Sequence, residues 1–485
     1  MVRDTAKAVP PNRRPAVGGY DPHVTSPLAV QPLPPLLSGP LPTTAYRIER
    51  FTLGNGLKVV LSPDGSAPVI GVVVSYNVGM RSEPQGRTGF AHLFEHLMFQ
   101  GSQNLAKLEH FRYVQSSGGV FNGSTHVDYT NYYETLPSNA LERTLFLEAD
   151  RMRAPLITPE NLANQIAVVK EEIRLQVQNQ PYGGFPWCFL PAVMFDTFAN
   201  SHDGYGSFAD LDAATVADAE SFFHAYYAPA NAVLAVAGDF DPVRARELVE
   251  RHFGDIPARS APTLPNFDEP DLRAPRRVRH QDRLAPMPAV ALAWRVPDPV
   301  EKFSDYLTYV LLAEVLTDGD ASRLVERLLL RDGIATSIGG YVGLMAEAFA
   351  SRGPTQLILE AHYPSDVSTD TVIDTIDAEL ARLAGDGIAS AELDRVRTRV
   401  AAGLLKGCDA TLGRTLLLAA LEQHHGRAEL INELSGLLAQ ITPEQIQAAA
   451  ATLHPQRRAV LELVPSGAAD PTATAEQPQP ESELS

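Results

Sequence analysis

Three side chains within one short segment, His92, Glu95 and His96, constrain how this 485-residue chain folds more than any other feature. On an α-helix, residues three and four positions apart share one face, so the two imidazoles project together with the carboxylate beside them. Two neutral imidazoles at this spacing can bind one zinc ion, and the adjacent carboxylate can accept a proton from water on the metal. The alternative is a chance match, in which two histidines lie on a polar helix surface.

The sequence around this segment favours the metal site. Residues 69–78 are rich in valine, which is typical of a buried strand. Thr88 precedes the segment and is a candidate N-cap for the helix. Apolar side chains then recur at helical spacing, at Leu93, Phe94, Leu97 and Met98. We therefore expect an amphipathic helix whose histidines lie beside its buried face.

A third metal ligand is expected, because catalytic zinc sites usually have three from the protein. In the segment 159–173, apolar residues at helical spacing define one buried face, namely Leu162, Ile166, Val169 and Ile173. At about 100° per residue, Glu172 falls beside this face and Glu171 falls opposite it. Glu172 is therefore the predicted ligand, since a buried glutamate without a partner is costly, and Glu171 is a solvated charge. Gln165 lies on the same edge and is a candidate partner that orients Glu172.

These residues resemble the metal-binding pattern of the pitrilysin/insulinase family of zinc peptidases, an H-x-x-E-H helix followed by a distant glutamate. Further segments that resemble this family lie at 51–60, 118–125, 130–133, 147–152, 322–324 and 332–335. The resemblance covers residues 46–465 and is closest to the bacterial branch that is similar to mitochondrial processing peptidase.

The resemblance implies a zinc-dependent endopeptidase. One zinc ion per chain would be bound by His92, His96 and Glu172. Glu95 would be the general base that activates the metal-bound water for attack on a peptide carbonyl. The alternative within the same fold is a non-catalytic structural or assembly subunit, which usually loses the metal motif that is present here.

The resemblance also implies a binding strand for a peptide substrate. The strand that includes Asn122, Gly123, Ser124 and Thr125 would be a sheet edge, to which an extended peptide adds through backbone hydrogen bonds. Asn122 matches a family position near the scissile bond. Its alternative role is that of a turn residue after two glycines.

One departure from the family concerns the second half of the chain. Family members usually carry an arginine and a tyrosine, seven positions apart, that contact substrate near the zinc. The corresponding positions here are Leu329 and Thr336, and the nearby Arg331 is followed at that spacing by Ile338. The chain is therefore expected to be the catalytic subunit of a two-chain enzyme, whose homologous partner supplies the arginine and tyrosine.

Composition excludes several classes of protein. The net charge of −18 argues against nucleic-acid binding, which requires a basic surface. No apolar run is long enough to span a membrane, and residues 1–44 lack the apolar segment of a secretory signal. The two cysteines, Cys188 and Cys408, imply no disulfide framework. The cytoplasm is the expected compartment.

The order of the predicted elements indicates an α+β fold with two homologous α/β-sandwich domains joined by a linker. The expected catalytic domain spans 45–258, the linker 259–275 and the second domain 276–466. A proline-rich tail at 1–44 and a polar tail at 467–485 flank them. A helix, a proline and a strand recur at 222–236 and 449–463, which supports two related halves. The pair His424 and His425 is expected on the surface of a helix.

Overall fold

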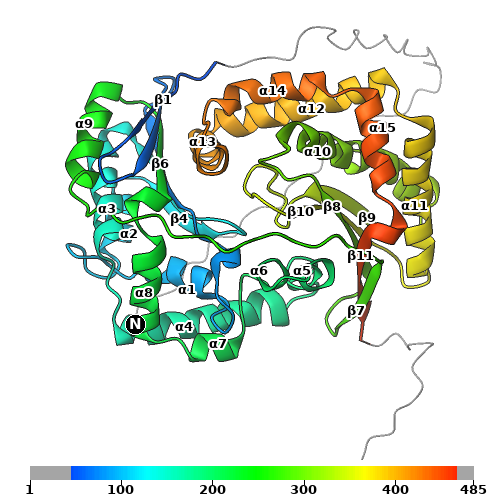
Figure 1. Cartoon of the computed structure of the whole chain (residues 1–485), viewed down its shortest axis with the longest axis horizontal. Coiled ribbons are helices and arrows are strands. Elements are labelled where there is room, and N and C mark those ends of the chain that lie inside the picture. The colour runs from blue at the N-terminus through cyan, green and yellow to red at the C-terminus, as the bar shows by residue number, and fades with distance from the viewer. Residues whose placement is uncertain (1–44, 467–485) are drawn as a thin grey trace, which may run out of the picture. The chain divides into compact units, whose positions relative to one another are not determined.

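Runs of small and branched apolar residues form two sheets in the computed structural model, which describes residues 45–466 (Figure 1). The first sheet has the order β1-β2-β6-β3-β5-β4 and the second the order β7-β11-β8-β10-β9. The strands of the first sheet are β1 Glu49–Thr52, β2 Lys58–Pro63, β3 Val69–Tyr76, β4 Val120–Thr125, β5 Thr130–Pro137 and β6 Ala232–Gly238. Those of the second are β7 Arg276–Asp282, β8 Ala289–Val296, β9 Ser337–Val342, β10 Thr355–His362 and β11 Arg458–Pro465.

The two sheets share one pairing pattern. In the first, β2 pairs with β6 in parallel, and the successive pairs β6–β3, β3–β5 and β5–β4 are antiparallel. In the second, β7 pairs with β11 in parallel, and β11–β8, β8–β10 and β10–β9 are antiparallel. The strands β4 and β9 therefore occupy equivalent edges. The predicted α+β fold with two similar halves is confirmed.

Helices connect the strands in each half. In the first half they are α1 Phe90–Leu97, α2 Glu109–Ser116, α3 Leu141–Arg153, α4 Pro159–Ile173, α5 Leu190–Met194, α6 Phe198–Ser201, α7 Phe208–Asp212, α8 Val216–Tyr226 and α9 Pro242–Phe253. In the second half they are α10 Phe303–Thr317, α11 Thr369–Asp386, α12 Ser390–Asp409, α13 Thr411–His425, α14 Leu430–Gln440 and α15 Pro443–Thr452. Short 3₁₀ turns lie at Met80–Ser82, Ser138–Ala140, Pro229–Asn231 and Pro455–Arg457, and π-helical turns at Arg174–Gln178 and Val325–Arg331.

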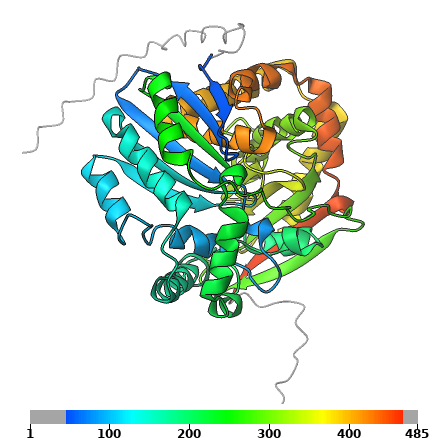
Figure 2. The same ribbon diagram turned by 60° about the vertical axis from the view of Figure 1, so that its left-hand side comes forward.

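Each half also covers a sheet face of the other half. Helix α13 packs on β3 and β6, where Leu418 and Leu421 join Val73 and Val233 in one apolar cluster. Residues of α5, including Leu190, pack in return on the second sheet. Figures 1 and 2 both show α13 (orange) beside the strands of the first sheet. The hydrophobic effect therefore joins the two halves, because each buries apolar surface that the other would leave exposed.

The boundaries predicted at 258 and 275 fall between α9 and β7, in a stretch without helix or strand. The tails expected at 1–44 and 467–485 lie outside the described residues. Among residues 45–466, no helix combines the length and the apolar character that crossing a membrane requires.

Candidate metal centre

The helix α1 begins where a carboxylate outside the helix accepts its free N–H groups. Gly89 is the N-cap, with a left-handed φ of 82°, and Glu83 accepts from the N–H groups of Gly89 at 2.9 Å and Ala91 at 2.8 Å. The prediction that Thr88 is the N-cap is wrong. Because Glu83 accepts the free N–H groups that an N-cap side chain would accept, the Thr88 hydroxyl donates to Asp210 instead, at 2.5 Å.

Helices α1 and α4 bring three potential ligand side chains together. The Nε2 atoms of His92 and His96 lie 3.3 Å apart. The carboxylate oxygens of Glu172 lie 3.6 Å from His92 Nε2 and 3.4 Å from His96 Nε2. Ligands of a tetrahedral zinc ion with bonds of about 2.0–2.1 Å are themselves about 3.3–3.4 Å apart. The donor set therefore fits zinc, and the spacings of 3.3–3.6 Å lie close to those of a tetrahedral site.

The two adjacent glutamates of α4 point in different directions. The side chain of Glu171 is 58% exposed and pairs with Arg174 at 3.1 Å. That of Glu172 is 32% exposed and faces the two histidines. Gln165 is buried on the same helix, and its amide donates to Asn164 at 2.8 Å. The hydrogen bond to Glu172 comes instead from the hydroxyl of Tyr205, at 3.1 Å.

The electrostatics of the three candidate ligands suit a cation. Burial, together with the charge of the neighbouring His96, lowers the pKa of His92 to about 4, so the imidazole is neutral. Burial would lower the pKa of His96 too, but the hydrogen bond to Glu172 and the charges of Glu95 and Glu172 raise it. Burial opposes ionisation of Glu172, yet its contacts with the two histidines keep its pKa below the usual value. The Glu172 carboxylate is thus charged and faces the two imidazole nitrogens that could bind the same metal ion.

Glu95 lies between the candidate ligands and the edge strand β4. Its Oε2 accepts a hydrogen bond from Thr125 Oγ1 at 2.7 Å. Burial raises the pKa of Glu95, and this hydrogen bond partly opposes the shift. A Cβ at Gly123 would lie 3.0 Å from Glu95 Cγ, so a glycine there lets the strand approach the helix closely. These positions bring the carboxylate, the candidate metal site and the strand edge together.

Strand β4 ends the first sheet, so one row of its backbone groups faces no other strand among the described residues. Asn122 is exposed on it. Ser124 donates to Asn131 of β5 at 2.7 Å, and Thr125 donates to Glu95. The four residues predicted to contact substrate thus lie on one free edge beside the candidate metal site.

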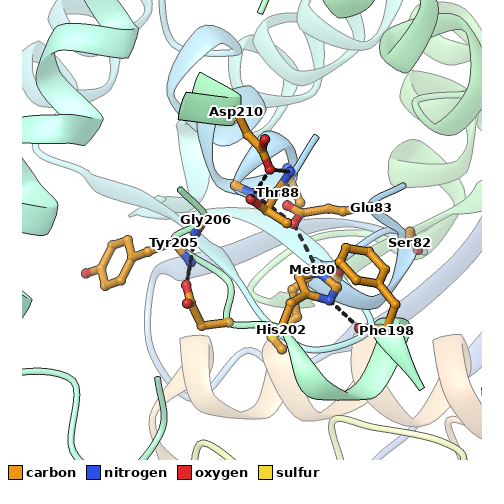
Figure 3. Close-up of polar contacts among 12 residues, drawn as sticks. Met80, Ser82, Glu83, Thr88, Phe198, His202, Tyr205, Gly206 and Asp210 are labelled. Carbon is orange, nitrogen blue, oxygen red and sulfur yellow. Dashed lines mark hydrogen bonds and ion pairs between the residues drawn. The ribbon is translucent and has the colours of Figure 1, made fainter. Parts of the chain in front are cut away.

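A loop at residues 202–207, here called the support loop, connects the N-terminus of α1 to Glu172. Asp203 accepts from the N–H groups of Tyr205 and Gly206, both at 2.9 Å. Gly206 has a φ of 74°, and a Cβ there would lie 2.3 Å from the carbonyl of Thr88. Figure 3 shows this loop beside the start of α1. Sequence reasoning missed Tyr205, because no periodic pattern marks a loop residue.

A buried ion pair holds the other end of the support loop. Nδ1 of His202 lies 2.7 Å from the Phe198 carbonyl and Nε2 lies 2.8 Å from the Met80 carbonyl (Figure 3). A neutral imidazole donates only once, so this ring carries two protons. Glu83, 3.3 Å away, balances the charge. Burial alone would lower the pKa of His202, but the contact with Glu83 raises it. Burial raises the pKa of Glu83, and three donors face this carboxylate and partly oppose the shift, namely the N–H groups of Gly89 and Ala91 and the His202 ring.

A second group of potential metal ligands lies away from this site. His110, Glu134 and Glu148 are all buried and offer atoms within 4.8 Å of one another. His110 is hydrogen-bonded to Glu134, and Arg151 donates to Glu148. The guanidinium of Arg151 also lies 4.3 Å from the ring centre of Tyr132. An arginine therefore already supplies the positive charge that a metal would bring.

In the second half, Leu329, Thr336 and His424 all contact other parts of the chain. Leu329 packs against the apolar core, and the hydroxyl of Thr336 donates to the His362 carbonyl at 3.1 Å. The prediction that His424 lies on the surface is wrong: it is buried, and its ring centre is 5.7 Å from that of Tyr129. The physical reason is that α13 packs between the first sheet on one side and α12 and α14 on the other, so less of its surface is left for solvent.

Two family models match this chain. The insulinase model (peptidase family M16) matches residues 58–185, and the model of the peptidase M16 inactive domain matches residues 213–400. The zinc protease PqqE of Helicobacter pylori is 30% identical over 374 residues, which cover 75% of this chain and 80% of that protein. A protein of Bacillus subtilis named "uncharacterized zinc protease YmxG" is 24% identical, with 87% of this chain and 99% of that protein covered.

Solved structures share the fold. A crystal structure of a protease from Helicobacter pylori matches with a TM-score of 0.80 at 24% identity, covering 87% of this chain and 100% of that one. The periplasmic protease PqqL of Escherichia coli matches with a TM-score of 0.70 at 20% identity, covering 88% of this chain but 48% of that one.

Proposed function

The chain belongs to the insulinase family of peptidases, M16, and from this premise we propose that it is a zinc-dependent endopeptidase. His92, His96 and Glu172 hold the metal, one ion per chain, and Glu95 moves the proton. The observation that carries the proposal is the convergence of three ligand side chains, whose imidazole nitrogens and carboxylate oxygens lie 3.3–3.6 Å apart, close to the spacing in a tetrahedral zinc site. Two relatives whose names contain "zinc protease" support it.

When bound, zinc acts as a Lewis acid and lowers the pKa of a water molecule. The residues of the chain supply the remaining functions. Glu95 accepts a proton on its carboxylate and donates it to the leaving amine, and the hydroxyl of Thr125 orients this carboxylate. Tyr205 orients Glu172 through its hydrogen bond. The free edge of β4 binds the peptide backbone in an extended conformation, with Asn122 beside the scissile bond.

The active enzyme, in this proposal, contains two chains. Leu329 and Thr336 stand where an arginine and a tyrosine are expected, and neither side chain can replace them. A homologous partner chain would supply that pair. The match to PqqL supports this arrangement, because the present chain covers 48% of that protein and the remainder has room for a second unit of similar size. We place the enzyme in the cytoplasm, which the unpaired and buried thiols Cys188 and Cys408 support.

Metal analysis and a peptide-cleavage assay test the proposal. Glu95→Gln is expected to keep one zinc per chain and to lower turnover by about 10²–10⁴-fold, because the proton carrier is lost. Glu171→Gln is the matched control: it removes the exposed carboxylate next to Glu172 and should leave both values unchanged. A native protein that purifies without zinc, or a Glu95→Gln variant with native turnover, would contradict the proposal. Full turnover by the single purified chain would contradict the two-chain arrangement alone.

A further inference from the structure

Two cavities flank the candidate metal site, and both share His92, Glu95 and Glu172. The first, here called the apolar cavity, has a volume of about 230 Å³ and is walled by Met80, Trp187, Tyr205, Leu344 and Met345. The second has a volume of about 460 Å³ and is walled by Phe99, Gln100, Phe111, Asn122 and Gln165. A peptide that crosses the metal site therefore meets a different environment on each side of the scissile bond.

The apolar cavity is built by both halves of the chain. Leu344 and Met345 follow β9 in the second half, whereas the metal-binding residues lie in the first. The carboxylate of Glu347 holds this segment in place, 2.9 Å from His126 Nδ1 and 2.9 Å from the hydroxyl of Tyr129. The wall formed by the second half is thus anchored to the turn that follows β4.

A second set of contacts fixes the same segment. The N–H of Arg352 donates to Asp128 at 2.9 Å. The guanidinium of Arg81 donates to the carbonyls of Arg352 and Pro354, both at 2.6 Å. Arg81 and Asp128 are buried in the first half, so the segment that follows Met345 is attached to that half at Arg352 and Pro354 as well as at Glu347.

The lining of the apolar cavity favours one large apolar side chain. The carboxylates of Glu95 and Glu172 are already engaged, the lining imidazole of His126 lies 2.9 Å from Glu347, and Glu347 itself is not part of the lining. Removing apolar surface from water is favourable, whereas an unpaired charge there would lose its hydration. Small-molecule ligand sites usually measure about 300–1,000 Å³, so about 230 Å³ suits a single side chain better than a whole ligand.

The position of the cavity along β4 indicates which substrate residue enters it. The apolar cavity touches Ser124 and Thr125, and the second cavity touches Asn122 and Gly123. A peptide added antiparallel to β4, as β5 is on the other side, has its amino-terminal part at the Thr125 end. We propose that the apolar cavity selects a large apolar side chain on the amino side of the scissile bond, so that the second half sets specificity for chemistry carried by the first. This inference depends on the proposed peptidase function.

Charge substitutions at Met345 test the proposal. The Met345 side chain is exposed enough, at 42%, to be replaced without disturbing the core. The probes are peptides that differ only in the residue on the amino side of the cleaved bond, which is Leu, Phe, Asp or Lys. Binding is measured by fluorescence anisotropy in the zinc-loaded Glu95→Gln protein. In the active enzyme, kcat/KM is measured for each peptide, and mass spectrometry identifies the bond that is cleaved.

The native cavity is expected to prefer the Leu and Phe peptides at least about tenfold over the Asp and Lys peptides. Met345→Lys should shift the ratio towards the Asp peptide about fivefold or more, and Met345→Glu should shift it towards the Lys peptide. Such opposite shifts cannot result from unfolding. Leu330→Lys, a charge placed at a 64% exposed position of the same half, is the control and should leave the ratios unchanged.

The outcomes separate the two proposals. Three outcomes would each overturn the role of the cavity. The first is that both Met345 variants keep the native ratios of peptide preference, and the second is that all four peptides bind equally or not at all. The third is cleavage that puts the preferred apolar residue on the carboxyl side of the bond. Selective binding with the expected charge shifts, but without turnover even when the homologous partner chain is present, would support the cavity and count against the peptidase function.

Discussion

Two histidine–carboxylate clusters lie in the first half of this chain, and they differ in the source of their positive charge. The group of His92, His96 and Glu172 is partly open to solvent, and no arginine or lysine is paired with it among the described residues. The group of His110, Glu134 and Glu148 is buried throughout and contacts Arg151. Similar ligand types thus favour a metal in one place and an internal ion network in the other.

The protonation states show the same contrast. Burial raises the pKa of Glu134 to about 7. Burial and the charge of Arg151 lower the pKa of His110 to about 3. Below about pH 7, Glu134 is therefore protonated and donates a hydrogen bond to the neutral His110, and Arg151 balances Glu148. Ligand type alone does not identify a metal site; access from solvent and the absence of a built-in cation distinguish the first cluster.

The largest expected difference concerns metal content. His96→Ala should abolish stoichiometric zinc binding, because two remaining ligands do not make a stable tetrahedral site. His110→Ala should keep one zinc per chain. Inductively coupled plasma mass spectrometry on both purified variants measures this directly. Loss of zinc in His110→Ala with native folding by circular dichroism would remove the distinction between the clusters.

The next effect concerns stability. Arg151→Met leaves buried Glu148 without its cation and should lower the free energy of unfolding by about 3–5 kcal/mol. Arg153→Met is the control, because Arg153 pairs with Asp255, whose side chain is 69% exposed, and such pairs contribute about 0–1 kcal/mol. Urea denaturation measures both. Equal losses in the two variants would mean that Arg151 does not neutralise the buried cluster.

A pH-dependent effect should follow from Glu134. Its pKa in the folded state, about 7, lies above the unfolded value of 4.5, so its contribution is fully present below pH 4.5 and is lost as the pH rises through 7. Native protein should thus lose about 2 kcal/mol of stability between pH 5.5 and 8 through this group, since one pKa unit corresponds to about 1.36 kcal/mol. Glu134→Gln lacks this loss, so its stability relative to native should improve over that range. Denaturation curves at the two pH values test this, and a constant difference would refute the assignment.

The smallest expected effect distinguishes the open cluster. Tyr205→Phe removes the hydroxyl that donates to Glu172 and should weaken zinc binding about tenfold, because the carboxylate keeps its contacts with the histidines. Tyr113→Phe, at a 37% exposed position, is the control. Competition with a chromogenic chelator gives both affinities. Unchanged affinity in Tyr205→Phe would show that the support loop does not position the ligand.

Much of the fold follows from local patterns. The valine-rich segment at 69–78 became β3, and the repeated helix, proline and strand became α8–β6 and α15–β11. Helical periodicity also oriented Glu172 towards the histidines and Glu171 towards solvent. These features were predictable because side-chain direction within one helix or strand is set by its geometry alone.

Other features were not accessible from the sequence. The capping of α1 by Glu83, the hydroxyl of Tyr205 on Glu172 and the burial of His424 all depend on contacts between separate elements. A loop residue carries no period that predicts its partner, and a helix such as α13 shows no sign of which sheet it will cover.

The sequence by itself determined the ligand types, their spacing on α1 and the two-layer character of each half, because these depend on the regular geometry of single elements. The tertiary structure alone decided that α1 and α4 meet with ligand atoms 3.3–3.6 Å apart. It also decided that Arg151 occupies the other cluster and that Met345 reaches the candidate site from the second half. Such positions result from burying apolar surface between distant segments, and no local pattern specifies them.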